Sequence, residues 1–377
     1  MPYNNSNICC IFNLAPHYRS AIYKLMDKEL KCNFYFGDSI DTPIKIMKVN
    51  ELSGYKKTVE NINLFNGNKY KWQKGVIGLV FKNYKYFILT GDHSILSSWV
   101  IVFLAKFLNK KVFIWLHGLK SEKELHWKGK LRVYPFYKMS DKLLLYGDYS
   151  RKIMINKGFN PKKMFCIYNS LDYDKQLFIR KGLSKTDVYK NYFNNDLPVL
   201  IYIGRIQKIK KIDSILLSMI ILKQRSVYCN LIILGENADE ISFKKQIIDN
   251  GLETNVWIYG PCYQEQLIGE LIFNADVCVS PGNVGLTAMH CFVYGTPVIT
   301  NNNFETQMPE FEVIEPGING DFFEEDNVWD LTDKITNWIS LDKVRRENVR
   351  LSAYKIIDDK YNPHYQIDVL KRLINVD

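Results

Sequence analysis

The sequence lacks a hydrophobic run long enough to cross a membrane. A spanning helix needs about 20 consecutive apolar residues, and the longest candidate, residues 95–105, is interrupted by Ser97 and Ser98. The first 19 residues also lack the basic start, the long apolar core and the small-residue cleavage site of a secretory signal. We therefore expect a cytoplasmic protein whose contact with a membrane, if it has one, is peripheral and at the inner face of the cell membrane.

Paired cysteines and metal-ligand spacings are absent as well. The eight cysteines form no Cys-x-x-Cys pair and have no histidine neighbour at zinc-ligand spacing. We expect reduced thiols, mostly in the core, and no metal site. Asp172 and Asp174 lie close together, but two acidic residues in a polar connector are a weak signal for a cation.

Several well-known motifs are missing. The sequence has no Walker loop, Rossmann glycine fingerprint, nucleophile elbow or Ser-His-Asp order. No helix-turn-helix, zinc-finger or RNA-binding signature occurs, so we expect no nucleic-acid partner.

What the sequence does contain is a regular alternation of strand-like and helix-like segments, typical of an α/β fold with parallel sheets covered by helices on both faces. The strand-like runs are 7–14, 32–37, 86–91, 111–118, 142–147, 164–169, 198–204, 230–235, 255–260, 276–282 and 296–301. The helix-like stretches between them include 20–30, 94–109, 149–157, 212–224, 238–250, 263–274 and 285–294.

This pattern and the length indicate two domains. A chain of 377 residues with 47% apolar composition can fill two cores. The polar, weakly periodic stretch 170–198 is the kind of segment where domain boundaries fall. We predict a first domain over residues 1–190 and a second over 197–360, while the final helical stretch 363–376 can pack on either.

Charge is unevenly distributed between the halves. Residues 1–196 carry 33 Lys and Arg against 15 Asp and Glu, a net +18, whereas residues 197–377 carry 17 against 25, a net −8. The basic half suits an anionic membrane surface or a polyanionic acceptor. A lysine-rich composition with a solvated basic face explains the charge equally well.

A basic turn follows the first strand of the second half, GRIQKIKK (204–211). Ligands of open α/β sheets bind beyond the carboxyl ends of the strands. Gly204 permits a tight turn, Arg205 can grip a phosphate with two hydrogen bonds, and Lys210 or Lys211 adds a second positive charge. We favour phosphate binding over an exposed basic turn, because an arginine after a strand-terminal glycine is poorly placed for packing.

A second glycine-rich turn lies in SPGNVGLTAMH (280–290) and opens onto a helix whose N–H groups and dipole favour an oxyanion. Tight strand-to-helix packing is the alternative explanation. The candidate binding residues are Gly282, Asn283, Val284, Gly285, Leu286 and Thr287. His290 follows among apolar residues, and on packing grounds alone such a histidine is more often part of a core than a ligand contact.

His117 ends the strand-like run VFIWLHG and precedes a glycine. A side chain at this position projects toward the ligand end of the sheet. A ligand hydrogen bond and a turn-stabilising role are equally compatible with it.

Taken together, these segments resemble the retaining nucleotide-sugar glycosyltransferases of the GT-B fold, specifically glycosyltransferase family 4 (glycosyl transferases group 1). The matching stretches are YIGRIQKIKKIDSIL (202–216), ADVCVSPGNVGLTAMHCFVYGTPVIT (275–300) and PEFEVIEPGINGDFF (309–323). Weaker similarity lies in WLHGL (115–119), LLLYGDYSRKIMINKGF (143–159) and IYNSLDYD (167–174).

The resemblance implies two facing Rossmann-like domains with an inter-domain cleft, the donor on the second and the acceptor mainly on the first. It assigns Arg205 and Lys210 to the donor diphosphate, with Lys211 as the alternate, and places His117 near the donor sugar. It also implies a last helix that crosses back to the first domain. The donor substrate that it implies is a UDP- or GDP-sugar. It implies no metal, no cofactor and no protein nucleophile.

The sequence departs from the family at three places. Two glutamates usual in the family are replaced by Gly282 and His290, so the donor-sugar contact would come from backbone N–H groups of 282–285 or from the Asn283 amide. A neutral imidazole can still bind a ribose hydroxyl, and the alignment favours that role for His290. The expected glycine-rich loop after the first strand is replaced by NLAPHYRS (13–20), where His17, Tyr18 and Arg19 are alternatives.

We therefore predict a retaining, metal-independent hexosyltransferase that acts on a glycan or lipid-linked acceptor in surface polysaccharide or glycolipid assembly. Because both glutamates are missing, a non-catalytic partner subunit that binds nucleotide-sugar or glycan is the alternative. A nucleotide-sugar epimerase is a third option. Arg205 and Lys210 favour turnover, because a diphosphate clamp is most useful in a transition state.

Overall fold

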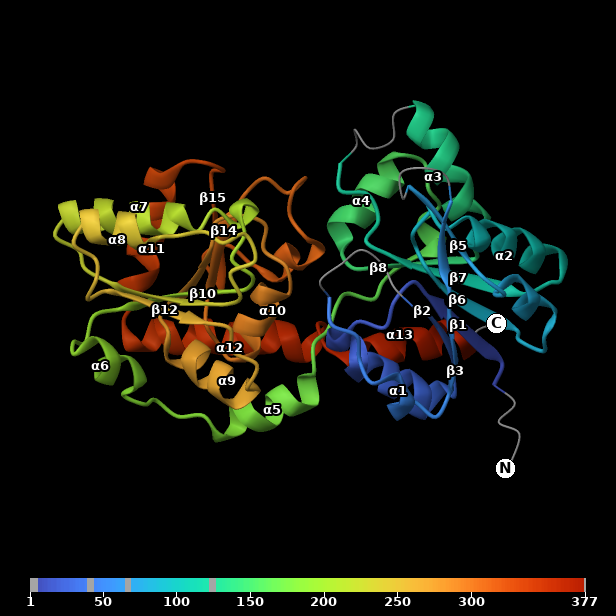
Figure 1. Ribbon diagram of the computed structural model, residues 1–377, viewed down its shortest axis with the longest axis horizontal. Helices are drawn as coiled ribbons and strands as arrows, with labels where there is room; N and C mark the ends of the chain where they lie inside the picture. The colour runs from blue at the N-terminus through green and yellow to red at the C-terminus, as the bar shows by residue number, and fades with distance from the viewer. Residues whose placement is uncertain (1–5, 39–43, 65–68, 122–126, 376–377) are drawn as a thin grey trace. The chain divides into compact units, whose positions relative to one another are not determined.

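Buried strands alternate with helices along the chain and form two separate parallel sheets (Figure 1). The computed structural model divides into a first unit, residues 1–172 with 362–377, and a second unit, residues 173–361. These sheets confirm the predicted α/β fold. The residues that the structure describes are 6–38, 44–64, 69–121 and 127–375.

The first unit is built on a seven-stranded parallel sheet in the order β3-β2-β1-β6-β7-β8-β9. In β1, with the sequence ICCIF, every residue is buried. Side chains alternate across a strand, so Ile11 enters the core on one face and Cys10 the core on the other. The strands are β1 (Ile8–Phe12), β2 (Asn33–Gly37), β3 (Tyr55–Val59), β6 (Tyr86–Thr90), β7 (Lys111–Leu116), β8 (Lys142–Leu145) and β9 (Met164–Cys166), and a separate antiparallel hairpin consists of β4 (Asn61–Leu64) and β5 (Tyr70–Gln73).

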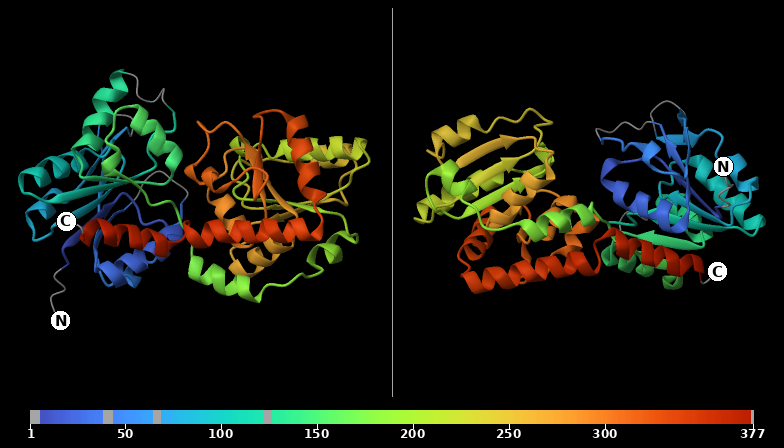
Figure 2. Two further views of the ribbon diagram at one scale, coloured as in Figure 1. Left: turned by 180° about the vertical axis from the view of Figure 1, so that it is seen from behind. Right: turned by 90° about the horizontal axis from the view of Figure 1, so that it is seen from below.

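Helices cover both faces of the first sheet. They are α1 (Ser20–Leu30), α2 (Leu96–Phe107), α3 (Trp127–Met139), α4 (Asp148–Asn156) and α13 (Pro363–Asn375). The core around Ile11 receives side chains from α2, α3 and α4, and the core around Cys10 receives them from α1 and α13. Figure 2 shows α13 beside α1, although the two helices come from opposite ends of the chain.

The second unit contains a six-stranded parallel sheet in the order β12-β11-β10-β13-β14-β15. Its strands are β10 (Val199–Ile203), β11 (Asn230–Leu234), β12 (Val256–Gly260), β13 (Val277–Ser280), β14 (Val298–Asn301) and β15 (Gly320–Phe323). Its helices are α5 (Tyr173–Gly182), α6 (Val188–Phe193), α7 (Asp213–Gln224), α8 (Lys244–Asp249), α9 (Glu265–Asn274), α10 (Leu286–Val293), α11 (Val328–Ile339) and α12 (Lys343–Asp359). In Figure 1, α7, α8 and α11 lie on one side of this sheet, and α9, α10 and α12 lie on the other.

The boundary between the units differs from the predicted one. Residues 173–190 belong to the second unit, because α5 packs against α9 and α10. The boundary therefore lies inside the predicted connecting stretch 170–198, but near its start and not at residue 190. The C-terminal helix α13 lies in the first unit, where the family resemblance placed it. Gln366 ties it there, since its Nε2 donates to Tyr168 O at 2.8 Å and its Oε1 accepts from Ser170 Oγ at 2.6 Å.

Several elements were not predicted because they bury too little apolar surface to produce a pattern. The middle of β3 exposes Lys56, Lys57 and Thr58. The hairpin strands β4 and β5 are short and only partly buried. Without regular apolar alternation, such strands resemble loops in the sequence.

Cysteine placement agrees with a reduced core. All eight cysteines are free thiols, and only Cys166 and Cys262 are partly exposed. Within the described residues, none of the helices combines the length and the apolar character that crossing a bilayer requires.

Candidate functional site

The candidate site of the second unit lies where its strand order reverses. From β10 the chain continues to β11 and β12 on one side, and it then returns to add β13, β14 and β15 on the other. The loops that follow β10 and β13 therefore leave the sheet in opposite directions from neighbouring strands. In α/β sheets this switch point is where ligands bind.

The turn after β10 requires glycine. Gly204 has a φ of +141°, and a Cβ on Gly235 would lie 1.8 Å from the Gly204 carbonyl oxygen. Two side chains hold this turn, because Tyr202 Oη donates to Arg205 O at 2.8 Å and Thr287 Oγ1 donates to Ile203 O at 3.0 Å. Arg205 is thereby fixed through its backbone while its side chain is exposed.

Lys210 ends a short 3-10 helix, η6 (Lys208–Lys210), and points at the second loop. Its Nζ donates to both Asn283 O and Asn283 Oδ1 at 2.7 Å. Burial and the nearby Arg205 charge lower the pKa of Lys210 to about 8, against a smaller opposing effect of Glu310. Arg205 and Lys210 thus form a pair of neighbouring cations, and a bound anion would offset their mutual repulsion.

Lys211 points elsewhere. Its Nζ pairs with Glu325 Oε1 at 3.1 Å and with Asp326 Oδ1 at 2.6 Å. These carboxylates neutralise it, so the geometry favours Lys210 as the second cation of the site.

Gly282 lies against η6 with no room for a side chain. Its N–H donates to Lys210 O at 3.0 Å. A Cβ at this position would lie 2.1 Å from Ile209 O and 2.6 Å from Lys210 Cα. A glutamate at 282, as in the family pattern, would require the backbone of η6 to move.

A buried amide network that the sequence reading missed holds the loop after β13. Gln307 Oε1 accepts from Val284 N at 2.7 Å, and Asn301 Nδ2 donates to the carbonyls of Pro281 and Gly282 at 2.8 and 2.9 Å. In the sequence, Asn301 and Gln307 are simply polar residues after a strand. Only their burial, at 1% exposure each, reveals the role.

The same network orients the start of α10. Val284 is buried, so it contributes backbone rather than side chain to the site. Gly285 caps the helix, and the N–H groups of Leu286 and Thr287 have no preceding turn to bind. They supply donors and a partial positive charge close to Arg205 and Lys210.

His290 lies one turn further along α10 and already has a partner. Its Nε2 lies 2.8 Å from Glu265 Oε1 on α9, which also accepts from Gln176 Nε2 and Tyr294 Oη. Burial would raise the pKa of Glu265, but these hydrogen bonds outweigh it and lower that pKa to about 2. His290 can therefore reach a ligand only through its other ring nitrogen.

Glu310 is a second carboxylate that the sequence reading did not single out. It lies on η7 (Pro309–Val313), is 2% exposed, and has its Oε2 4.0 Å from the position of a Cβ on Gly285. Its charge also acts on Lys210. The site thus contains an acid although neither position 282 nor position 290 carries one.

His117 lies in the first unit, where it follows β7. Its ring is 4.8 Å from that of Tyr146, and the Arg19 guanidinium lies over Trp115 and Tyr146 at 4.9 and 5.2 Å. The side chain is exposed to solvent, yet desolvation by the crowded atoms around the ring, followed by the charges of Arg19 and Lys120, lowers the pKa of His117 to about 4. At neutral pH it is an uncharged hydrogen-bonding group.

The alternatives after β1 are not equivalent. His17 Nδ1 lies 3.2 Å from Lys45 O and its side chain is exposed, whereas Arg19 joins the aromatic group beside His117. Among the residues that the structure describes, no three His, Cys, Asp or Glu side chains gather as metal ligands, including around Asp172 and Asp174.

Comparison with known proteins finds a similarity that lies within the second unit. Residues 184–355, a little under half of the chain, match the model described as Glycosyl transferases group 1. A relative from Klebsiella pneumoniae, described as an uncharacterized 41.2 kDa protein in the cps region, is 27% identical over 260 residues, covering 64% of this chain and 67% of its own.

Solved structures show the same fold over nearly the whole chain. Alr3699/HepE of Anabaena, crystallised with UDP, superposes with a TM-score of 0.74 at 14% identity, covering 98% of this chain and all of its own. The apo lipopolysaccharide outer core galactosyltransferase WaaB superposes with a TM-score of 0.66 at 15% identity, over 98% and 99%. The fold is that of GT-B glycosyltransferases.

We expect that Gly282→Ala lowers the free energy of unfolding by about 1–3 kcal/mol, because the new methyl group collides with the backbone of η6. Urea denaturation monitored by circular dichroism measures the change. Gly182→Ala is the matched control, since no atom lies within 4 Å of a Cβ there. Equal stabilities of the two variants would contradict the close approach.

If Arg205 and Lys210 hold a nucleoside diphosphate, the charge of Lys210 should appear as a pH dependence of that binding. Because its pKa in the free protein is about 8, the amine loses its proton as the pH rises from 7 to 9, and affinity for UDP should fall by up to about tenfold per pH unit above 8. Isothermal titration calorimetry measures this slope. Lys210→Gln should abolish it and Lys208→Gln should retain it; an unchanged slope in Lys210→Gln would show that another group is responsible.

Proposed function

We propose that the protein is a retaining, metal-independent glycosyltransferase that moves a hexose or related sugar from a UDP- or GDP-sugar to a glycan or a lipid-linked acceptor. The observation that carries the proposal is the convergence of Arg205, Lys210 and the start of α10 at the switch point of the second sheet. The match of this unit to Glycosyl transferases group 1 supports it.

The chemistry follows from where positive charge is placed. When a sugar leaves a nucleoside diphosphate, negative charge develops on the departing phosphate. Arg205, Lys210 and the free N–H groups at Leu286 and Thr287 are organised before the reaction, so they can stabilise this charge without rearranging. His117 would contact the sugar as a neutral donor or acceptor, and His290 the ribose through its second nitrogen.

The donor and the pathway are proposed from the relatives. HepE has been crystallised with UDP and with UDP-glucose, and the Klebsiella relative is described by its place in the cps region. These descriptions support a UDP-sugar donor and a role in surface polysaccharide or glycolipid assembly.

A non-catalytic partner subunit that binds nucleotide-sugar is the second candidate. The observation that favours it is that Gly282 cannot carry the family's glutamate without a backbone shift. Two measurements distinguish the candidates. A thermal-shift screen with UDP, GDP, ADP and their sugars identifies the donor that binds. Release of nucleoside diphosphate from that donor shows a transferase, whereas binding without release shows a non-catalytic subunit.

With a donor identified, Arg205→Ala should lower the transfer rate by about 100- to 1,000-fold with little change in stability, because the lost contact is made to charge that develops in the transition state. Release of nucleoside diphosphate measures the rate. Lys208→Ala, an exposed cation in the same turn, should behave as wild type. Wild-type turnover in Arg205→Ala would contradict the role of Arg205 in holding the diphosphate. Activity that is abolished by EDTA and restored by Mn²⁺ would contradict the metal-independent mechanism.

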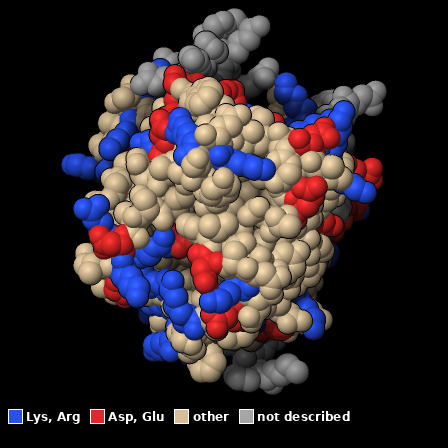
Figure 3. Space-filling view, turned by 90° about the vertical axis from the view of Figure 1, so that its left-hand side faces the viewer, with Lys and Arg blue, Asp and Glu red and all other residues tan. Residues whose placement is uncertain are grey.

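Peripheral contact with an anionic membrane is also part of the proposal, and the first unit supports it. This unit carries 30 Lys and Arg against 14 Asp and Glu, a net +16, and the second carries 20 against 26. Figure 3 shows acidic and basic side chains interspersed on one face of the second unit. Between Glu60 and Glu122 the sequence contains nine lysines and only one acidic residue, Asp92.

Exposed aromatic rings accompany these lysines on α2. Phe103 and Phe107, one turn apart, are 53% and 72% exposed, and their rings lie 4.8 Å from each other. The short 3-10 helix η3 (Ile77–Phe81), which contacts α2, ends at Phe81, and this residue is 68% exposed. Aromatic rings flanked by lysines are the composition of a surface that lies in a membrane interface.

We expect the protein to float with vesicles that contain about 30% phosphatidylglycerol and not with pure phosphatidylcholine, since each lysine near an anionic surface adds about 1 kcal/mol. Phe103→Ser with Phe107→Ser should reduce the bound fraction by at least about tenfold. Phe178→Ser, which removes an 81% exposed ring from the second unit, is the control. Equal flotation of both variants would exclude α2 as the contact.

A further inference from the structure

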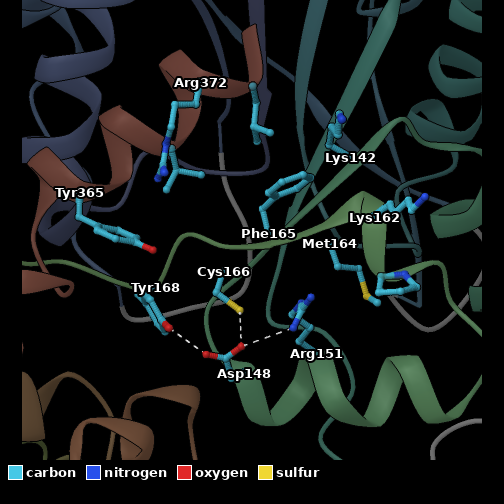
Figure 4. Close-up of a pocket in the computed structure, with 13 residues that line it drawn as sticks. Lys142, Asp148, Arg151, Lys162, Met164, Phe165, Cys166, Tyr168, Tyr365 and Arg372 are labelled. Carbon is cyan, nitrogen blue, oxygen red and sulfur yellow. Dashed lines mark hydrogen bonds and ion pairs between the residues drawn. The ribbon is translucent and has the colours of Figure 1, made fainter. Parts of the chain in front are cut away.

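A pocket in the first unit lies at the edge of the sheet, beside the outermost strand β9 (Figure 4). Its volume is about 610 Å³, within the range of small-molecule sites. β8 and β9, α4, α13 and the short 3-10 helix η5 (Pro161–Lys163) supply its walls. No predicted site residue lines it, although Asp148, Arg151 and Tyr168 fall within the two stretches of weaker family resemblance, 143–159 and 167–174.

Four cationic side chains from four separate elements surround this pocket. Lys142 begins β8, Arg151 lies on α4, Lys162 on η5 and Arg372 on α13. Figure 4 shows them arranged around Phe165. Like charges that converge on one cavity repel one another in the empty protein, so a bound anion would stabilise this arrangement.

Asp148 is the acidic residue among the residues that line the pocket, and its carboxylate already has hydrogen-bond partners. Its Oδ2 accepts from Tyr168 Oη at 2.9 Å and its Oδ1 from Cys166 Sγ at 3.3 Å. Arg151 approaches this carboxylate at 3.9 Å. Lys142, Lys162 and Arg372 have no such carboxylate partner among the residues lining the pocket. Arg372 Nε donates to Asp368 O of its own helix at 3.3 Å, and its side chain also hydrogen-bonds Tyr365.

Crowding of lysines extends along the same edge of the sheet. Lys163 is adjacent to the pocket, and burial, followed by the charges of Lys106, Lys142 and Lys111 against an opposing effect of Asp141, lowers its pKa. Positive charge in this part of the first unit therefore extends beyond the residues that line the pocket.

The floor of the pocket is apolar. Phe165 of β9 packs in the same core as Val369 and Leu373 of α13, whereas Met164 belongs to the core on the other face of the sheet. The amine of Lys142 lies 5.2 Å from the Phe165 ring. Inorganic phosphate would fill only a small part of such a cavity. An apolar floor inside a ring of cations matches a ligand with an anionic head and an apolar body.

We propose that this pocket binds a phosphate-bearing amphiphile, with the phosphate held by Lys142, Lys162 and Arg372 and the apolar part packed on Phe165 and Leu373. The inference comes from the pocket alone and does not depend on the proposed transfer reaction. The phosphate can belong to a membrane lipid or to a soluble phosphate ester.

Calorimetry with the full chain tests the proposal. Octyl phosphate should bind at least about tenfold more tightly than either of two comparison compounds. These are inorganic phosphate, which lacks the alkyl chain, and octyl glucoside, which lacks the charge. Lys162→Gln with Arg372→Gln should weaken octyl phosphate by about tenfold or more. Lys142→Gln with Lys162→Gln, which leaves α13 intact, should have a similar effect.

Lys56→Gln with Lys57→Gln is the matched control, because it removes two exposed lysines from β3 at the opposite edge of the same sheet. Circular dichroism and thermal unfolding verify that each variant is folded. The proposal is overturned if octyl phosphate binds no better than the two comparison compounds, or if the pocket variants bind it as the control does.

Vesicles distinguish the two sources of phosphate. Flotation with vesicles containing phosphatidic acid, reduced in the pocket variants but not in the control and competed by octyl phosphate, identifies a lipid headgroup. A soluble phosphate ester is identified if octyl phosphate binding requires the pocket residues while vesicle binding does not. Vesicle binding independent of the pocket, with no octyl phosphate binding, contradicts the site.

Discussion

A close approach between two loops determines the geometry of the candidate donor site. Gly282 donates to the carbonyl of Lys210, and the Lys210 amine reaches back to Asn283. These bonds join the turn after β10 to the turn after β13 across the switch point of the sheet. They bury Lys210 beside Arg205 and so create a partly desolvated pair of cations, which is the feature that a diphosphate recognises best.

The same approach explains why the family's first glutamate is absent. A side chain at 282 would enter the backbone of η6, so the loop can either carry the carboxylate or keep this close contact. Carboxylates reach the region from other elements instead. Glu310 enters from η7 beside Gly285, and Glu265 enters from α9 to hold His290. Both carboxylates thus come from elements other than the loop after β13, so a donor contact here would be organised differently from the family pattern.

The fold and the loops of the site could be predicted because their signals are local. Buried strands such as β1 and β10 are continuous apolar runs, and residues directly after them must lie at the ligand edge. Gln307, Glu310 and Glu265 could not be predicted, because their roles depend on which elements meet in space. The stretch 170–198 could be predicted to contain the boundary, but its place near residue 173 could not, because only the packing of α5 on α9 assigns this helix to the second unit.

Charge separation between the units has a further consequence for recognition. The second unit is net acidic, so attraction of a nucleotide there must come from the local field of Arg205, Lys210 and the start of α10 rather than from a long-range field. The first unit is strongly basic, and its charge falls off over about 8–10 Å at physiological salt. A phosphate-rich surface or amphiphile would therefore be drawn to the first unit without competing for the donor site. With both proposed ligands, such a division would let one chain bind two anionic partners at separate sites.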